Sequence, residues 1–458
     1  MGWPLMSTLT ACAGPAMPPS ATAASTPWAL ADTVDAAFEY AFPLYEMART
    51  RYGALEHAAN PARGQVNVVG HRRTLSDHRA RAVTTPNNDT LYSSCWLDLS
   101  AGPVRISVAQ MPAGCYWSVA LMDFFTNHIV VLGSRLDGPG PVMASLVSAR
   151  WAGAWPAGRV IVAPGDDAWL LGRWLVDGPH DLAAGHAMQD GLGVLPIIGS
   201  RTDPAVARPA NTRVVPRSSN DPEVFLAVVN QALARNPAPG QDAHLLSRYA
   251  SVGLSAAMPA WADLPEPVRA AWRDRIGPGH VALRSGLARG ARSVQGWRLP
   301  PEAIGNFGAD HALRAAVALG GLAALEPAEA IYLARETDVS GAPLDGQHHY
   351  RIRIPATGVP TDAFWSLSVY ERMPDGRLFF TDNPIGRYAV GDRTPGLRRA
   401  ADGAFDLWLQ QRQPDDVAQR SNWLPAPPGP MQLSLRAYLP RPELRQGRAA
   451  LPIVERVI

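Results

Sequence analysis

The stretch 83–100, VTTPNNDTLYSSCWLDLS, decides how the chain folds, because turn-forming polar residues pass directly into a strand. Pro86 and the Asn-Asn-Asp run after it favour a turn, since Asn and Asp side chains hydrogen-bond to backbone groups close to them in sequence. The residues from Tyr92 onward are rich in Cys, Trp and Leu, which is typical of a half-buried β-strand. The stretch therefore predicts a turn that opens directly into a strand.

The same polar run also has the chemistry of a pocket wall. Asp89 is a candidate general base or metal ligand, and Tyr92 is a candidate hydrogen-bond donor to an oxyanion. Asn88 would lie beside them at the mouth of the pocket. The sequence leaves two interpretations open: turn chemistry alone, or turn chemistry that also carries a site.

Period-two alternation predicts two β regions that are separated by helices. Between residues 83 and 176, Val104, Ile106 and Val108 face one way while their polar neighbours face the other, as in an antiparallel sandwich. Alternation returns from residue 348 in a second set of strands. Apolar residues at helical spacing predict helices at 33–56, with Thr33 as its cap, at 178–192, at 221–237 and onward to 335.

These patterns predict four segments along the chain. They are a leader or disordered tail at 1–32, an N-terminal β domain at 33–200, a helical module at 201–335 and a C-terminal β domain at 336–458. The tetrapeptide LTAC that ends at Cys12 resembles a bacterial lipoprotein cleavage box, which predicts a periplasmic or envelope-associated protein. No positive charge precedes this tetrapeptide, so a cytoplasmic location is the alternative.

The composition excludes several classes of function. A formal net charge of +2 argues against a strongly basic nucleic-acid-binding surface. The chain contains no lysine, which excludes Schiff-base enzymes, pyridoxal-phosphate enzymes and P-loop NTPases. No apolar run reaches the length of a membrane-spanning helix.

Several motifs resemble one bacterial family. They are TTPNNDTLYSSCWLDLS at 84–100, GRWLVDGPHDLAAGHAMQDGL at 172–192, NFGADHALRAAVALGGLAALEPAEAIY at 306–332, FWSLSVYE, DNPIGRYAVGDRTPGL and NWLPAPPGPMQLSLRAYLP. In this order they are similar to proteins built from domain of unknown function 1254 (DUF1254) followed by domain of unknown function 1214 (DUF1214). The resemblance implies a mainly β fold with an N-terminal immunoglobulin-like β-sandwich, a helical middle module and a C-terminal jelly-roll β-sandwich. It implies no particular chemistry.

The segment GHRRTLSDH at 70–78 has two interpretations of its own. His71, Asp77 and His78 are residue types that bind zinc or another divalent metal. Their spacing matches no standard metal motif, and the surrounding arginines favour an anion-binding loop, since guanidinium groups fork around carboxylate or phosphate. We therefore predict no cofactor and no metal site, with a divalent metal here as the alternative.

The non-core face of the C-terminal β domain is polar as well. Alternation places on it the side chains of Arg351, Arg353, Ser366, Ser368, Tyr370, Arg436 and Tyr438. A solvent-exposed face is the favoured interpretation. The alternative is a ligand cleft in which Arg387 and Arg393 clamp an anionic group.

We therefore predict a cofactor-independent small-molecule enzyme with hydrolase- or lyase-like acid/base chemistry in a pocket near residues 71–92. The candidate catalytic residues are Asp89, His71 and Tyr92. The candidate substrate-binding residues are Asn87, Asn88, Trp96, Arg173, Arg387 and Arg393. The alternative is a non-catalytic, envelope-associated protein for ligand binding or surface assembly. In both cases we expect a small-molecule ligand, no nucleic acid, no transmembrane segment and a homo-oligomer.

Overall fold

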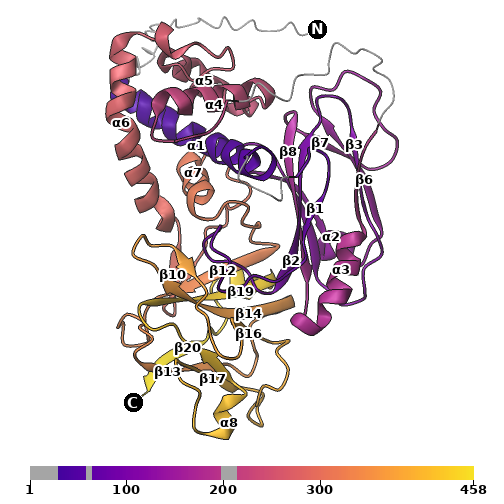
Figure 1. Cartoon of the computed structure of the whole chain (residues 1–458), viewed down its shortest axis with the longest axis vertical. Helices are drawn as coiled ribbons and strands as arrows, with labels where there is room; N and C mark the ends of the chain where they lie inside the picture. The colour runs from indigo at the N-terminus through magenta and orange to yellow at the C-terminus, as the bar shows by residue number, and fades with distance from the viewer. Residues whose placement is uncertain (1–28, 58–63, 198–213, 458) are drawn as a thin grey trace, which may run out of the picture.

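The computed structural model describes residues 29–57, 64–197 and 214–457. Helix and strand are present in nearly equal shares, 28% and 29%. The chain forms several β-sheets, a central helical region and a C-terminal half-barrel sheet (Figure 1). The predicted order of β, helical and β regions is confirmed, whereas the expectation of a mainly β chain underestimates the helices. Cys12 and the segment around it lie outside the described residues.

The N-terminal β region consists of two sheets that enclose one core. The five-stranded sheet is antiparallel, in the order β1 (Gly70–Arg72), β2 (Thr90–Asp98), β8 (Asp167–Leu175), β4 (Trp117–Met122) and β5 (His128–Gly133). The four-stranded sheet has the order β7 (Val160–Ala163), β6 (Val142–Ser148), β3 (Val104–Val108) and β9 (Leu192–Pro196), with β6 and β7 parallel. Alternate residues of both sheets, among them Leu91, Ile106 and Val119, form the core between them. The helices α2 (Ser134–Asp137) and α3 (Leu182–Asp190) belong to this region.

The helical region forms around α1 (Leu30–Leu55), which is buried on almost every side. Among its charged side chains, Asp35 pairs with Arg275 and Glu46 pairs with Arg49. The helices that contact α1 are α4 (Pro222–Arg235), α5 (Ala243–Tyr249), α6 (Glu266–Ser285) and α7 (His311–Gly320). The helix begins before the predicted cap, and Thr33 instead donates from Oγ1 to the Ala29 carbonyl at 3.2 Å. By sequence α1 falls in the predicted N-terminal β domain, but it packs with the helices.

The C-terminal β region also has two sheets around one core. The seven-stranded sheet has the order β10 (Arg292–Val294), β11 (Trp297–Leu299), β12 (Ala330–Arg335), β19 (Met431–Pro440), β14 (Thr361–Arg372) and β15 (Leu378–Phe379), with β16 (Ala389–Gly391) beside β14. The four-stranded sheet has the order β18 (Trp423–Pro425), β17 (Phe405–Gln410), β13 (His349–Ile354) and β20 (Ile453–Val457). Two short helices complete it, α8 (Val417–Arg420) and α9 (Pro442–Arg445). Strands β10 to β12 pair here although their residues fall in the predicted helical segment 201–335.

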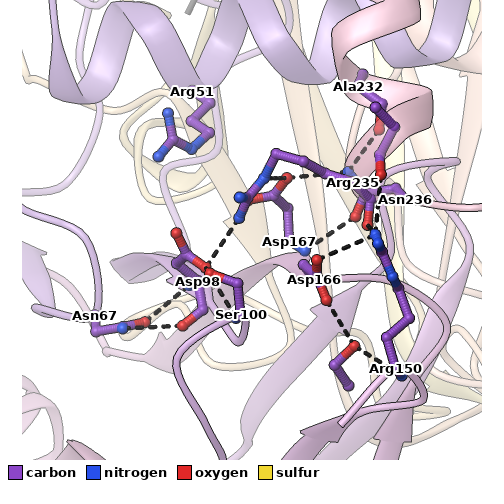
Figure 2. Close-up of polar contacts among 12 residues, drawn as sticks. Arg51, Asn67, Asp98, Ser100, Arg150, Asp166, Asp167, Ala232, Arg235 and Asn236 are labelled. Atoms are coloured by element: carbon purple, nitrogen blue, oxygen red, sulfur yellow. Dashed lines mark hydrogen bonds and ion pairs between the residues drawn. The ribbon is translucent and has the colours of Figure 1, made fainter. Parts of the chain in front are cut away.

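A network of charged side chains fixes the end of α4 to the five-stranded sheet (Figure 2). Arg235 donates from Nε and Nη2 to the carboxylate of Asp167 at 2.7 and 2.8 Å, and its Nη2 lies 2.9 Å from an oxygen of Asp98. Asn236 donates to the same Asp167 carboxylate at 3.0 Å and accepts from its backbone N–H at 2.9 Å. Asp167 is only 2% exposed, so its charge requires such partners. The network therefore joins the helical region to the N-terminal β region.

We expect Arg235→Met to lower the free energy of unfolding by about 3–5 kcal/mol, because it removes the ion pair of a buried carboxylate. Chemical denaturation followed by tryptophan fluorescence measures the loss. The matched control is Arg273→Met, which breaks an exposed ion pair with Glu266 and is expected to change stability little. Equal losses in the two variants would contradict a structural role for the network.

Candidate functional site

Residues 84–90 lie between the five-stranded N-terminal sheet and the seven-stranded C-terminal sheet, directly before and at the start of β2. The backbone N–H of Thr85 donates to the Leu378 carbonyl at 2.8 Å, and the Leu378 N–H donates to Thr84 Oγ1 at 3.0 Å. The hydroxyl of Tyr370 donates to the Pro86 carbonyl at 2.7 Å. The C-terminal sheet therefore holds the turn that precedes the N-terminal strand.

Asn87 is buried at the centre of this turn. Its Oδ1 accepts from the backbone N–H of Asp89 at 2.8 Å, which is the predicted Asn turn. Its Nδ2 donates to the Tyr438 hydroxyl at 2.9 Å, to Thr90 Oγ1 at 3.1 Å and to the Tyr92 hydroxyl at 3.3 Å. One amide side chain thus connects β2 with β19 across the two β regions.

Asp89 extends from the same turn toward β14. Its Oδ2 accepts a hydrogen bond from the Ser366 hydroxyl at 2.6 Å. Burial raises the pKa of the Asp89 carboxyl above its ordinary value, although the nearby Arg436 and the hydrogen bond from Ser366 act in the opposite direction. Part of the residue nevertheless stays accessible to solvent. A buried carboxyl group with a shifted pKa is a candidate acid/base group.

The polar face of β14 and β19 is buried against this turn, so the solvent-exposed interpretation is wrong for these strands. Arg436 donates to Ser368 Oγ at 2.9 Å and to the carbonyls of Thr85 and Pro86, both at 3.1 Å. Thr85 has a φ of 50°, a left-handed conformation that is uncommon for threonine, and Arg436 stabilises it. The buried residues of this face are Ser366, Ser368, Tyr370, Arg436 and Tyr438.

Arg173 lies opposite this face, on β8, directly across from Tyr92 on β2. Its guanidinium carbon is 5.6 Å from the centre of the Tyr92 ring, and its Nη2 donates to the Ala323 carbonyl at 2.7 Å. The residue is only 5% exposed. Among the described residues, its Nε and Nη1 have no hydrogen-bond partner. An unsatisfied buried guanidinium is uncommon and requires an explanation.

Tyrosine hydroxyls surround the Arg173 charge. They belong to Tyr92, Tyr116, Tyr332 and Tyr438, each close enough to influence the guanidinium. Burial raises the pKa of Tyr332 and of Tyr438, so both are neutral hydrogen-bonding groups at neutral pH. We call Asn87, Asp89, Tyr92, Arg173, Tyr332 and Tyr438 the junction site, because they bring the two β regions together.

Two further groups lie beside the junction site. Burial, together with the charges of Arg173 and Arg135, lowers the pKa of His128 to about 3, so its imidazole is neutral. Neither ring nitrogen of His128 has a hydrogen-bond partner in the described part of the chain. Glu329 is fully buried and accepts from the Tyr116 hydroxyl at 2.8 Å and from Arg135 Nε at 2.7 Å. Arg135 therefore has an anionic partner.

His71 is not brought together with Asp89 and Tyr92. It lies on β1 opposite Ser93, and its Nδ1 is 2.8 Å from Ser93 Oγ. Because side chains alternate along β2, Ser93 and Tyr92 point to opposite faces of the sheet. Burial and the charge of Arg73 lower the pKa of His71, although Asp190 opposes this. His71 therefore faces α3 and the sandwich core rather than the junction site.

The other two residues from the first motif have structural partners. Asn88 donates from Nδ2 to the Ser76 carbonyl at 2.5 Å, which fixes the preceding loop. Trp96 stacks on Trp169 with ring centres 4.8 Å apart and an angle of 6°, inside the core that includes α1. Neither belongs to the junction site.

Arg387 and Arg393 do not form a common clamp. Arg387 donates from Nη1 to the carbonyls of Ser421 and Trp423, both at 2.9 Å, inside the C-terminal region. Arg393 forms a two-point ion pair with Asp177, which follows β8. Arg393 thus connects the two β regions at a more exposed position.

The 70–78 segment distributes its charged groups among different partners. Asp77 binds Arg79, His78 lies 2.8 Å from the Tyr388 hydroxyl, and Arg73 pairs with Asp190. In the part of the chain that the structure describes, no three His, Cys, Asp or Glu residues gather as a metal site would require. Within the same residues, no helix combines the length and apolar character of a membrane span.

Two small hollows lie outside the junction site. One, of about 20 Å³, lies between α1 and α4, and the other, of about 10 Å³, lies beside Arg387 and Tyr388. These volumes are of the order that holds a water molecule. Neither hollow is large enough for a substrate.

Sequence reasoning assigned Asn87, Asp89, Tyr92 and Arg173 to the site but not their partners. The sequence pattern did indicate some of these partners. On β19, Arg436 and Tyr438 alternate with core residues, as in a buried polar face, and Ser366 alternates in the same way on β14. No pattern indicated His128, because it is a single His before an ordinary apolar strand. The faces of two separate sheets can be matched only when their packing is known.

Two family descriptions match the chain: Protein of unknown function (DUF1254) at residues 66–196, and Protein of unknown function (DUF1214) at residues 329–442. The chain belongs to the proteins in which DUF1254 is followed by DUF1214, as its motifs indicated. No curated protein matches it.

Among solved structures, the VPA0106 protein from Vibrio parahaemolyticus is similar, with a TM-score of 0.69 and 22% identity over 94% of this chain and 100% of that chain. This likeness concerns the fold alone. An uncharacterized protein from Burkholderia cenocepacia has a TM-score of 0.43 and 14% identity over 93% of this chain and 95% of that chain.

We expect Asn87→Ala to lower the free energy of unfolding by about 2–3 kcal/mol, because it leaves buried hydroxyls and a backbone N–H without their partner. Urea denaturation measures this loss. Asn88→Ala is the matched control, since this neighbour loses only the contact to the Ser76 carbonyl and is expected to cost about 1 kcal/mol. A larger loss in Asn88→Ala would show that Asn87 is not the link between the β regions.

Proposed function

We propose that the protein is a small-molecule enzyme that works without an organic cofactor, with Asp89 at the junction site as the group that accepts and returns a proton. The observation that carries the proposal is the position of Asp89, where the two β regions meet. Burial raises the pKa of its carboxyl group, and part of the residue remains accessible. Such a carboxyl group exchanges protons closer to neutral pH than an ordinary aspartate.

The neighbours of Asp89 suit hydrolase- or lyase-like chemistry. The Ser366 hydroxyl binds one carboxylate oxygen and orients the group. The Tyr92 hydroxyl accepts a hydrogen bond from Asn87, so its own proton is available to a bound molecule. A phenol that donates to an oxygen stabilises negative charge developing there. The site thus offers one acid/base group and one donor.

A non-catalytic, envelope-associated ligand-binding or surface-assembly protein is the second candidate. It is favoured by the small volume of the two hollows, neither of which would hold a substrate. An envelope location rests on the lipoprotein-like LTAC that ends at Cys12. That location and self-association of the chain are retained as proposals.

The fold names implied by the family resemblance are proposals too. Two facing sheets of five and four strands around one core support an immunoglobulin-like assignment for the N-terminal region. Two sheets around the second core support a jelly-roll assignment for the C-terminal region. A comparison of strand connections with proteins of each fold tests both names.

The activity proposal is tested with purified protein and a panel of small esters, lactones and hydroxy acids. Asp89→Asn is expected to lower the turnover of any substrate by about 10²–10⁴-fold, because an amide cannot carry the proton. His71→Ala is the matched variant, since the structure places this group on the other face of the sheet, and its turnover is expected to stay within about threefold of the original. Turnover that survives Asp89→Asn would contradict the proposal.

The pH dependence of the free energy of unfolding should show whether the pKa of Asp89 is raised in the folded protein. Because this pKa is raised on folding, the folded state holds the proton while the unfolded chain releases it, from about pH 4 upward. Stability therefore falls as pH rises between the unfolded and folded pKa values, and Asp89→Asn removes this fall. We expect the variant to gain stability relative to the original chain as pH rises above the ordinary pKa of an aspartate, as measured by urea denaturation, with Asp362→Asn as the exposed control. Parallel curves for Asp89→Asn and the original chain would show that the pKa is not raised.

A further inference from the structure

Arg173 is a buried cation without an anionic partner among the described residues. Its one hydrogen bond there is to the neutral carbonyl of Ala323, at 2.7 Å. Its Nε and Nη1, which carry most of its N–H groups, have no partner in those residues. A guanidinium stays charged at every physiological pH, so it cannot escape the cost of burial by losing its proton. A buried charge of this kind is stable only when an opposite charge or a full set of hydrogen bonds compensates it.

The other arginines around the junction site are already compensated. Arg436 donates to Ser368 and to the carbonyls of Thr85 and Pro86, so its guanidinium has several acceptors. Arg135 forms ion pairs with Glu329 and Glu326. Arg173 differs from them, because no ion pair and only one hydrogen bond of its guanidinium are present in the described residues.

The groups around Arg173 are neutral and able to hydrogen-bond. Tyr92 lies across the strand pair, and Tyr332 and Tyr438 approach from the C-terminal sheet. Phenol hydroxyls donate and accept, so they suit the oxygens of a small polar ligand. Tyr92 and Tyr332 keep part of their surface accessible, so this part of the site is not sealed off from solvent.

We infer that Arg173 binds the carboxylate group of a small ligand at the junction site. A carboxylate brings a single negative charge to a guanidinium that has no ion pair in the described residues, whereas phosphate can bring two charges into a buried place. The planar guanidinium also matches the two oxygens of a carboxylate. The Ala323 carbonyl holds Nη2 and so fixes the guanidinium from one side. This inference names the ligand class of the proposed enzyme, but the binding itself does not require that Asp89 be catalytic.

The test is thermal unfolding of the full chain with sodium propionate, with propionamide of the same size and shape but no charge, and with inorganic phosphate, all at equal ionic strength set by sodium chloride. Propionate at about ten times its Kd is expected to raise the unfolding midpoint by about 1–2 °C. Propionamide and phosphate are expected to give no rise. A larger rise with phosphate, or none with propionate, overturns the carboxylate assignment.

The variant Arg173→Met separates a ligand-binding arginine from a structural one. Removing a buried charge that has no ion pair in the described residues, while keeping an apolar chain of similar length, is expected to leave the midpoint unchanged or higher without propionate, and to abolish the propionate effect. A structural arginine would instead show a lower midpoint. Arg273→Met, at an exposed position, is expected to keep the full propionate effect. If Arg173→Met does not fold, Arg173→Lys takes its place and is expected to reduce the propionate effect, since lysine lacks the planar fork.

A last variant distinguishes this inference from the proposed function. Asp89→Asn is expected to keep the propionate-dependent rise, because Asp89 is not the anion-binding group. If turnover survives in Asp89→Asn while the propionate effect depends on Arg173, the acid/base role is wrong and the carboxylate site stands. If Asp89→Asn loses turnover while Arg173→Met retains the propionate effect, the carboxylate inference is wrong and the acid/base role stands.

Discussion

The hydrogen bonds from Arg436 to the carbonyls of Thr85 and Pro86 are the contact on which the candidate site depends. A turn directly before a strand presents carbonyl groups that its own sheet cannot satisfy, and buried carbonyls must find donors elsewhere. Here the donors come from the C-terminal sheet, through Arg436 and the Tyr370 hydroxyl. The turn that carries Asn87 and Asp89 therefore has its shape only when both β regions are folded and packed together. In this chain the two family regions therefore contribute contacts to the same turn.

Arginine side chains donate hydrogen bonds to the carbonyls of turns at several places in this chain, which contains no lysine. Three buried guanidinium groups each donate to the carbonyl of a non-glycine residue with positive φ, a conformation that costs energy and needs support. A guanidinium suits this role because its rigid fork reaches several acceptors at once. The pairs are Arg436 with Thr85, Arg173 with Ala323, and Arg335 with Gln295. Arg173 differs from the other two, since most of its donors remain unused after the turn is bound.

Local pattern was sufficient to predict most of the elements. Alternation located β2, β3 and β14, and the Asn turn before β2 was predicted from its chemistry. The sequence pattern was not sufficient to show which helices and strands pack together in the same hydrophobic core. The buried helix α1 packs among helices that follow much later in the chain, and β12 pairs with β19. Periodicity reports which face of an element is apolar, but not which distant face will cover it.

The sequence by itself therefore determined the order of β, helical and β regions, the turn at Asn87, and the presence of Asp89, Tyr92 and Arg173 as chemically capable residues. Only the tertiary structure decided that Arg173 joins Asp89 and Tyr92 while His71 and Trp96 do not. His71 is excluded because its partner Ser93 lies one position from Tyr92 on β2 and so points to the opposite face of the sheet. Trp96 lies on the same face as Tyr92, but farther along β2, in the core that includes α1. The polar face of β19 was also ambiguous, because a Ser, Arg and Tyr series is as typical of a solvent-exposed face as of a buried site. The packing of another layer of the protein against this face decided between the two.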